Sequence, residues 1–348
     1  MPTPDPMRTR AKSPATLRDV ARVAGVSPAT ASRALSTPAK VRAATLARVL
    51  AAAHERGYVL DGAARALRQG RTRTIGAVIP TLDNAIFANT THALQKALAA
   101  QGHTLLLACH EFDLTAEVHV ARQLIERGVD GLVLVGLDHR LELFHILETA
   151  AMPYLLTWAL DRSGRHACVG FDNREAAMRM VRYLLDIGHR DFAMIAGETA
   201  HNDRARSRFE GVVSALAAAG LAPSPDRFVE RAYTFAAGRD GMRALAALSP
   251  RPTAIICGND VLAIGALAEC RAAGIAVPAE VSLTGFDDLE VASMITPTLT
   301  TLRVPTRELG EAAAGAMLRI VSGDDATCCQ EIAVDLVVRE TTAPPRAR

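Results

Sequence analysis

A stretch near the N-terminus, residues 16–68, constrains the fold of this chain more than any other segment. Its first apolar residues recur at i, i+3, i+4 and i+7, the spacing of one helix face; they are Leu17, Val20, Ala21 and Ala24. Thr16 can cap this helix, and Asp19 places a negative charge where the helix dipole favours it. Gly25 then allows a tight turn, because a residue without Cβ enters left-handed conformations at little cost.

A second helix is predicted directly after that turn. Ser27 can cap it, and Pro28 suits its first turn, where no backbone donor is needed. A third helix over about 42–57 is expected to bury four apolar side chains, Leu46, Val49, Leu50 and Ala53. A second helix supported in this way presents its N-terminal residues outward, which is the geometry that enters a DNA major groove. The pattern therefore predicts a helix-turn-helix headpiece over residues 16–60.

The distribution of charge also favours a nucleic-acid-binding headpiece. Residues 1–72 contain 13 Lys or Arg and 4 Asp or Glu, a balance of +9. The other 276 residues contain 26 and 33, a balance of −7, which agrees with the net charge of +2 for the whole chain. A basic headpiece on a mildly acidic body is typical of a protein that binds a polyanion through one domain only.

From residue 74 onward, short β-rich runs alternate with helical stretches. The runs are IGAVIP (75–80), TLLLAC (104–109), GLVLVG (131–136), FAMIAG (192–197), TAIICG (253–258) and VSLTGF (281–286). Strands separated by helices predict parallel sheets with right-handed crossovers. The predicted fold is an α-helical headpiece followed by an α/β body of two doubly wound parallel-sheet subdomains. Two such units side by side form a cleft at the carboxyl ends of their strands, where small ligands bind.

Polar and aromatic residues near the ends of these runs are the candidate ligand-binding residues. They are Asn84, Phe87, Asp172, Arg208, Asn259 and Asp287. Hydrogen-bond acceptors together with an arginine suit the recognition of hydroxyl or carboxylate groups. Asn259 and Asp260 can equally well cap the helix that follows them. Trp158, the only tryptophan, is either a stacking residue or a buried core residue.

The sequence predicts neither a metal site nor a cofactor. The six cysteines show no CxxC or Cys/His metal spacing and are expected to be small buried hydrophobes. A redox-sensing role for the adjacent Cys328 and Cys329 is the alternative. An enzyme is not predicted, because GxSxG, HExxH and GxGxxG are absent and no lysine follows a glycine. Asp287 and Asp288 resemble a pair of catalytic carboxylates. The side chains of adjacent residues at one strand end, however, rarely converge on the same site.

The N-terminal tail and the hydropathy of the chain indicate a cytoplasmic protein. Residues 1–15 are proline-rich, contain scattered charges and have no apolar core segment, so we expect a disordered tail and no signal peptide. No apolar run reaches the roughly 18 residues that a membrane helix needs.

Several motifs in order resemble the lactose-repressor (LacI/GalR) family of regulators. VARVAGVSPATASRAL and RGYVLDGAARALRQGRTRTIGAVIP resemble its headpiece and hinge. IGHRDFAMIAG, CGNDVLAIGALAECRAAGIAVPAEVSLTGFDD and TPTLTTLRVPTRELGEAAA resemble its effector-binding body, which is similar to periplasmic sugar-binding proteins. The resemblance covers the chain except residues 1–15. It implies a hinge at 61–72 and an effector-binding and dimerisation domain at 73–343.

The resemblance also implies where the chain crosses between the two subdomains. The crossings fall near Phe171, Thr300 and Ile332. One subdomain then comprises 73–171 with 301–331, and the other 172–300 with 332–343.

For the headpiece, the resemblance implies which residues contact DNA. Pro28, Ala29 and Arg33 match positions that reach the major groove, and Arg33 can hold guanine O6 and N7 together. Phosphate contacts are assigned to four hydroxyl residues, Thr16, Ser27, Thr30 and Ser32. Thr16 and Ser27 can act as caps and as phosphate ligands at once.

In the hinge, Leu67 matches the leucine that wedges into a minor-groove step, while Arg65 is placed to hold phosphates or the groove floor. The usual Tyr-x-Pro-Asn entry is here Tyr58, Val59, Leu60 and Asp61. Gly62 lowers helix propensity by about 1 kcal/mol. We therefore expect the hinge helix to form only on operator DNA.

The function that the resemblance implies is a transcriptional repressor controlled by a small effector, which acts as inducer or corepressor. It would bind a pseudo-palindromic double-stranded operator as a homodimer. No heptad tail follows Val338, which favours a dimer over a tetramer. An activator of the same fold remains an alternative, as does a sugar-binding protein without a regulatory role, although the latter would need a signal peptide and would lack residues 16–68.

The expected effector is a sugar or a sugar acid. LLTWALDRSGRHACVGFDN resembles the gluconate-repressor branch of the family most closely. The resemblance favours Arg208, Asn259 and Asp287 above the other candidates, because they match effector-binding positions. It places Asp172, Phe87 and Tyr233 next, which adds Tyr233 to the candidate ligand-binding residues. Arg208 with Arg204 or Arg206 would suit a carboxylate, although two of these three arginines are expected to be solvated.

Overall fold

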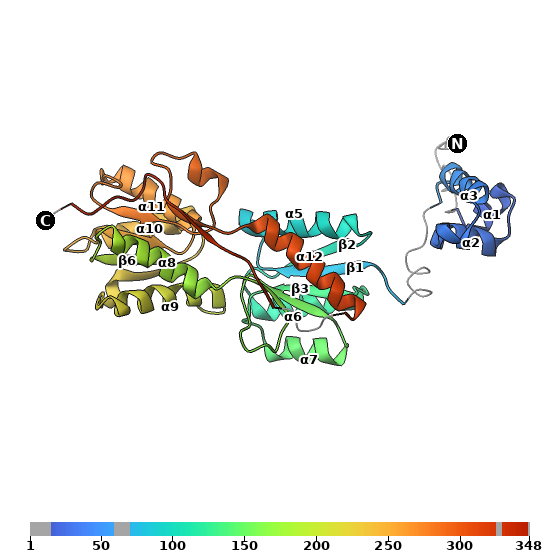
Figure 1. Ribbon diagram of the computed structural model, residues 1–348, viewed down its shortest axis with the longest axis horizontal. Helices are drawn as coiled ribbons and strands as arrows, with labels where there is room; N and C mark the ends of the chain where they lie inside the picture. Colours follow the sequence, from blue (N-terminus) through green and yellow to red (C-terminus); the bar gives the residue numbers. More distant parts are fainter. Residues whose placement is uncertain (1–14, 59–69, 325–328, 347–348) are drawn as a thin grey trace, which may run out of the picture. The chain divides into compact units, whose positions relative to one another are not determined.

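The structure is a computed structural model that describes residues 15–58, 70–324 and 329–346. The chain divides into two compact units, Met1–Thr72 and Arg73–Arg348, which are called here the headpiece and the body (Figure 1).

The headpiece contains the three helices that the sequence predicts. They are α1 (Leu17–Ala24), α2 (Pro28–Ser36) and α3 (Ala43–Arg56), with a short 3₁₀ turn at Pro38–Lys40. Thr16 and Asp19 form a reciprocal capping box at the start of α1. Gly25 ends α1 with φ of 64°, and the Ser27 side chain caps α2 by accepting from the Thr30 N–H. The predicted local signals of this module are therefore confirmed.

A small hydrophobic core joins the three headpiece helices. Its buried members are Val20, Ala21, Ala24, Ala31, Ala34, Val49, Ala52 and Ala53. The prediction for Leu50 is wrong, because its side chain is 51% exposed. Leu50 follows Val49 by one residue, which rotates its side chain about 100° from the buried face; Ala52 occupies that face instead. Leu46 is partly buried against the core.

The first lobe of the body is a six-stranded parallel sheet. Its strands, in sequence order, are β1 (Thr74–Ile79), β2 (Thr104–Cys109), β3 (Gly131–Val135), β4 (Tyr154–Thr157), β5 (Cys168–Gly170) and β11 (Cys329–Glu331). Their spatial order is β11-β5-β4-β3-β1-β2, and every pair is parallel. The helices α5 (Ala85–Ala100) and α12 (Thr306–Ser322) pack against each other (Figure 1). The helices α6 (Leu114–Glu126) and α7 (Leu141–Thr149) contribute to a separate core with β1, β3 and β4.

The second lobe is a four-stranded parallel sheet. It contains β6 (Phe192–Gly197), β7 (Phe228–Arg231), β8 (Ala254–Cys257) and β9 (Ser282–Thr284), in the spatial order β7-β6-β8-β9. Its helices pack in two pairs (Figure 1): α8 (Asn173–Asp186) with α9 (Asp203–Ala218), and α10 (Phe235–Ala246) with α11 (Asp260–Ala272). The doubly wound parallel sheets predicted from the alternating runs are thus confirmed.

Short segments connect the two lobes. Strand β10 (Thr301–Arg303) runs antiparallel to β12 (Asp335–Val337) in a separate two-stranded sheet. One hydrophobic cluster extends from the first lobe to the second, and it includes Trp158, Phe171 and Phe286. In each sheet the strand order reverses at the first strand, so that β1 and β6 each lie between strands that follow them in sequence. Ligands bind at such switch points in open α/β sheets.

The cysteines differ in part from the prediction. Cys257 and Cys270 are buried hydrophobes as expected, and burial raises the pKa of both thiols, that of Cys270 to about 12. Cys168, however, forms a disulfide with Cys329, which is exposed on β11. Parallel pairing of β5 with β11 places these two residues opposite each other although 161 residues separate them. Cys328 lies outside the described residues.

Candidate functional site

The N-terminal half of α2 presents an exposed surface on the headpiece. Ala31 and Ala34 bury one side of this helix. Pro28, Ala29 and Arg33 are exposed on the rest of it. The packing therefore leaves all three residues accessible to a macromolecule, as the helix-turn-helix prediction requires.

Hydroxyl groups surround this exposed end of α2. The Ser27 hydroxyl accepts from the Thr30 N–H at 3.1 Å and lies 2.9 Å from the Thr30 hydroxyl. Thr16 and Ser27 are exposed, while Thr30 and Ser32 are half-buried. Thr16 and Ser27 act as caps, which leaves their phosphate-binding role as a prediction. The hinge residues Arg65 and Leu67 lie outside the described residues, so their assignments also stay predictions.

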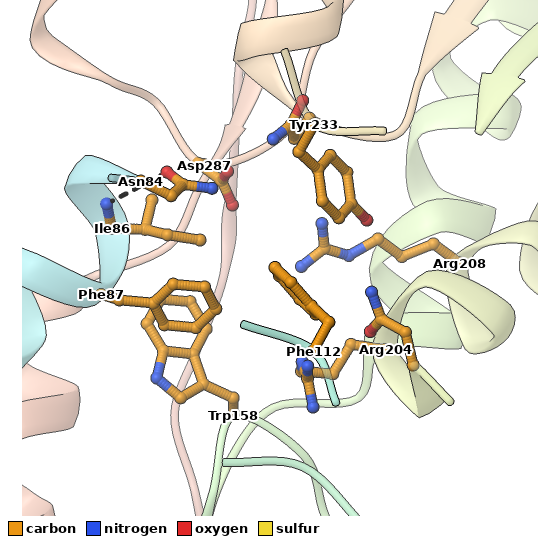
Figure 2. Close-up of a pocket in the computed structure, with 11 residues that line it drawn as sticks. Asn84, Ile86, Phe87, Phe112, Trp158, Arg204, Arg208, Tyr233 and Asp287 are labelled. Atoms are coloured by element: carbon orange, nitrogen blue, oxygen red, sulfur yellow. Dashed lines mark hydrogen bonds between the residues drawn. The ribbon is translucent and has the colours of Figure 1, made fainter. Parts of the chain in front are cut away.

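A polar pocket lies in the body at the carboxyl ends of the strands of both sheets (Figure 2). This inner pocket has a volume of about 20 Å³ and is lined by Asn84, Ile86, Phe87, Phe112, Trp158, Asn202, Arg204, Arg208, Tyr233, Asn259 and Asp287. It shares Asn84, Phe112, Asn202 and Tyr233 with a larger outer cleft of about 840 Å³. Six of the seven predicted ligand-binding residues therefore come together here. They are Asn84, Phe87, Arg208, Tyr233, Asn259 and Asp287.

Asp172 is the predicted residue that the fold places elsewhere. Its carboxylate caps α8 by accepting from the Glu175 N–H at 2.9 Å and pairs with Arg162 at 2.8 Å. It lines a separate surface pocket beside Glu331, where the chain leaves the first sheet. The prediction that Asp172 lies with the other candidates is therefore wrong. Its position after β5 puts it at the start of a helix that packs in the other lobe.

Asp287 has the most unusual environment in the inner pocket. It follows β9, is 3% exposed and has a φ of 116°. Neither carboxylate oxygen has a hydrogen-bond partner among the residues that the structure describes. Burial raises the pKa of Asp287 to about 7, although the nearby Arg208 guanidinium opposes this shift. A buried carboxyl without partners is costly, so this group is suited to accept hydrogen bonds from a ligand.

Arg208 is held rigidly beside this carboxyl. It extends from α9 and is 6% exposed. Its Nε donates to the Asn173 side-chain oxygen and its Nη1 to the Gly258 carbonyl, both at 2.9 Å. The guanidinium also lies 3.7 Å from the ring centroid of Phe286. Figure 2 shows the guanidinium pointing into the pocket, where it offers a fixed donor to a ligand oxygen.

The two arginines that precede Arg208 on α9 link the lobes. Arg204 is 7% exposed, and its Nη1 donates to the Val135 carbonyl at 3.2 Å and to Asp203 at 2.9 Å. Gly136 makes room for it, because a Cβ atom there would lie 1.8 Å from this nitrogen. Arg206 pairs with Asp138 at 2.7 Å.

The expectation that two of these three arginines are solvated is wrong. Arg204 and Arg208 are buried, and only Arg206 has a side chain that is 41% exposed. Their separation of four residues puts Arg204 and Arg208 on the same face of α9. That face points into the pocket.

Aromatic side chains form the other wall of the pocket. Phe87 and Trp158 pack edge to face with 5.3 Å between ring centroids. Trp158 is 2% exposed, so it is a buried core residue. It also lines the pocket, and its stacking on a ligand stays a prediction. Three of the eight non-glycine residues with positive φ in the described chain line the pocket, namely Phe112, Trp158 and Asp287. Such backbone strain is concentrated at functional sites.

Two asparagines combine capping with a place in the pocket. Asn259 is 2% exposed and caps α11 by accepting from the Leu262 N–H at 2.9 Å. Asn202, which the sequence reasoning missed, caps α9 in the same way through the Ala205 N–H. Both asparagines lie between a strand and the helix that follows it. This position is the sequence signal that could have identified Asn202. Phe112 and Ile86 gave no such signal, because only the fold brings them to the pocket.

The described residues lack two features that would indicate other kinds of site. They contain no helix that is long and apolar enough to cross a membrane. Within the same ranges, no group of three or more His, Cys, Asp or Glu side chains is placed to hold a metal ion.

A DNA-binding headpiece and a two-lobed body with a buried polar pocket together define a ligand-responsive DNA-binding regulator. Known protein families, individual proteins and solved structures that are similar to this chain agree with this class. Residues 16–61 match the model described as "Bacterial regulatory proteins, lacI family", and residues 181–342 match a "Periplasmic binding protein-like domain". The chain belongs to the LacI family of bacterial transcriptional regulators.

Individual relatives cover most of the chain. The HTH-type transcriptional repressor PurR of Aliivibrio fischeri is 31% identical, over 89% of this chain and 93% of the relative. The HTH-type transcriptional regulator GntR of Pseudomonas aeruginosa is 31% identical, over 98% and 99%. The crystal structure of the lactose repressor dimer bound to operator has a TM-score of 0.85 at 26% identity and covers 95% of this chain and 100% of that one. These relatives are regulators and not enzymes, as predicted.

Proposed function

We propose that this protein is a cytoplasmic transcriptional repressor whose affinity for operator DNA is set by a small effector bound in the inner pocket. One observation supports this most strongly. The buried Asp287 carboxyl, without a hydrogen-bond partner in the described chain, lies where two lobes meet, in a protein that also has a helix-turn-helix headpiece.

The proposed effector is a sugar or a sugar acid such as gluconate. The Asp287 carboxyl can accept hydrogen bonds from hydroxyl groups, and the amides of Asn84 and Asn259 can donate and accept. Arg208 would bind a carboxylate or a further hydroxyl. The rings of Phe87 and Trp158 offer an apolar face for the C–H side of a sugar.

Effector binding would require the lobes to move. The inner pocket, at about 20 Å³, holds about one water molecule. A sugar that reaches Asp287 and Arg208 must therefore separate the walls, and it would disturb the Arg204 and Arg206 contacts with the first lobe. We propose that this movement is transmitted to the hinge at 61–72. Because such coupling is reciprocal, operator should change effector affinity by the same factor.

On DNA, the proposed arrangement places α2 in the major groove, with Arg33 bound to guanine and Pro28 and Ala29 in apolar contact. Thr16, Ser27, Thr30 and Ser32 would hold phosphates, and Arg65 and Leu67 would contact the minor groove. A homodimer would present two headpieces to a pseudo-palindrome.

Part of the exposed apolar surface of the body lies around the outer cleft. Phe235, Val291 and Met294 are 53%, 39% and 69% exposed, and all border the outer cleft.

The proposed lobes are 73–171 with 301–331 and 172–300 with 332–343. Pairing of β11 with β5 supports this division for the first lobe.

The test is a fluorescence-anisotropy titration of the full chain on the palindrome nearest its own promoter, repeated with a panel of sugars and sugar acids. Saturable, salt-sensitive binding that one compound weakens identifies an inducer, and binding that one compound strengthens identifies a corepressor. The Arg208→Gln variant is the matched control, because it should bind operator without responding. Operator binding that no compound changes would contradict effector control, and a reporter assay distinguishes a repressor from an activator.

A further inference from the structure

Two cysteines far apart in the sequence meet at the edge of the first sheet. Cys168 on β5 and Cys329 on β11 are opposite each other in the parallel register, form a disulfide and have Cα atoms 4.6 Å apart. Cys168 is fully buried, whereas Cys329 is exposed. Neither the DNA surface nor the inner pocket uses this pair.

The bridge lies beside two of the connections between the lobes. After Cys168, β5 ends at Gly170, and α8 begins at Asn173 in the second lobe. After Cys329, β11 ends at Glu331, and the next strand, β12, pairs with β10 outside the first sheet. The two connections also contact each other directly, because the Ile332 N–H donates to the Gly170 carbonyl at 2.7 Å.

Strand β11 is weakly held without the bridge. It is a three-residue edge strand whose side chains are all exposed, so it buries little apolar area to keep it in place. Arg162 pairs with Asp172 at 2.8 Å and approaches Glu331 at 4.0 Å, but its side chain is 66% exposed, and such pairs contribute little. Besides the backbone pairing of the two strands, the disulfide is therefore the strongest restraint that ties β11 to β5.

We propose that Cys168 and Cys329 are a reversible oxidation site whose co-substrate is a low-molecular-weight disulfide, and that its oxidised form clamps the two connections between the lobes. In a reducing compartment a disulfide in a protein is typically transient and redox-sensing. The two cysteines also differ in accessibility: Cys329 is exposed and can meet a small disulfide, whereas Cys168 is buried next to it.

The chemistry balances as two thiol–disulfide exchanges. The exposed Cys329 thiolate attacks the small disulfide, forms a mixed disulfide and releases one small thiolate, which takes up a proton. The Cys168 thiolate then attacks the Cys329 sulfur and releases the second. The protein loses two electrons and two protons, and one disulfide becomes two thiols. The Asp161 N–H, 3.3 Å from the Cys168 sulfur, can stabilise that thiolate. Excess thiol reverses both steps.

The other cysteines of the described chain are poor competitors for this reaction. Cys257 and Cys270 are both buried free thiols in the second lobe, and burial raises their pKa values, so neither offers the accessible thiolate that starts the exchange, as the exposed Cys329 does. Burial also raises the pKa of the half-buried Cys109. The site should therefore be selective for the Cys168–Cys329 pair.

The test equilibrates the full chain in buffers of varied glutathione to glutathione disulfide ratio, followed by acid quench, alkylation and peptide mass mapping. We expect a cross-linked peptide containing Cys168 and Cys329 that forms and disappears reversibly with the ratio. Amide exchange of residues 329–337 should lose its protection on reduction. Cys168→Ser and Cys329→Ser should each abolish the cross-link and that difference, whereas Cys109→Ser and Cys328→Ser should leave both intact.

Three results would overturn the proposal. They are alkylation of Cys168 and Cys329 at every ratio, a cross-link that contains Cys328 in place of either residue, and identical amide exchange in the two redox states. None of these readouts uses operator or effector, so failure here is separate from failure of the proposed repressor function.

Discussion

Replacing Asp287 by asparagine should stabilise the folded body at alkaline pH while it weakens effector binding. Burial raises the pKa of this carboxyl from 3.8 to about 7. In the unfolded chain the group ionises near pH 4, so between that pH and about 7 the unfolded state releases a proton that the folded state keeps. The contribution of Asp287 to the free energy of unfolding is therefore fully present below the pKa that this carboxyl has in the unfolded chain. It is lost as the pH rises to the pKa that the carboxyl has in the folded protein.

The size of this loss follows from the pKa difference. Each pKa unit corresponds to 1.36 kcal/mol, so ionised Asp287 costs the fold about 4 kcal/mol above pH 7. With Asp287 only 3% exposed, solvent screening reduces this figure little. Asparagine is uncharged throughout and has nearly the same shape. Asp287→Asn should therefore raise the unfolding free energy by up to about 4 kcal/mol at about pH 8 and change it little at about pH 4.

Urea unfolding of the effector-free protein at several pH values measures this difference. The free energy of unfolding of the wild type should fall relative to that of Asp287→Asn as the pH rises from about 4 to about 8. Asp288→Asn is the matched control, because the neighbouring Asp288 is paired with Arg303 and Arg339 at 2.7 Å each, and its loss should destabilise the protein. The reasoning would be refuted if the difference in unfolding free energy between the wild type and Asp287→Asn stayed constant with pH.

Three further predictions concern the pocket, the contact between the lobes and the DNA surface. Arg208→Gln should abolish the change in operator affinity that effector causes in anisotropy titrations, while operator affinity without effector stays at the wild-type level. Gly136→Ala should lower the unfolding free energy by about 1–3 kcal/mol, because the added Cβ overlaps the Arg204 guanidinium. Gly164→Ala is its control, since Gly164 has a similar positive φ but no atom within 4 Å of an added Cβ; an equal loss in both variants would show that backbone strain alone is responsible. Arg33→Ala should weaken operator binding and reduce discrimination at one guanine by about 1–3 kcal/mol, measured against an operator changed at that base; unchanged base preference would exclude Arg33 as a base-reading residue.

Local sequence patterns determined the secondary structure and much of the pocket. Caps such as Thr16 and Ser27 and the turn at Gly25 act within three or four residues, so their signals survive in the sequence alone. The apolar runs predicted the strands for the same reason. Asn259 and Asp287 were found because parallel strands must bring their carboxyl ends to one edge of the sheet.

Only the tertiary structure decided which of these local features meet. Asp172 follows a strand as Asp287 does, yet the chain leaves the first sheet there and carries it away from the pocket. Arg204 is buried because Gly136, from the other lobe, leaves space for its guanidinium. Cys168 and Cys329 are paired because β11 returns to the edge of a sheet whose other strands were formed far earlier in the chain. These outcomes depend on contacts between residues about 70 to 160 positions apart, and periodicity and capping chemistry contain no information over that range.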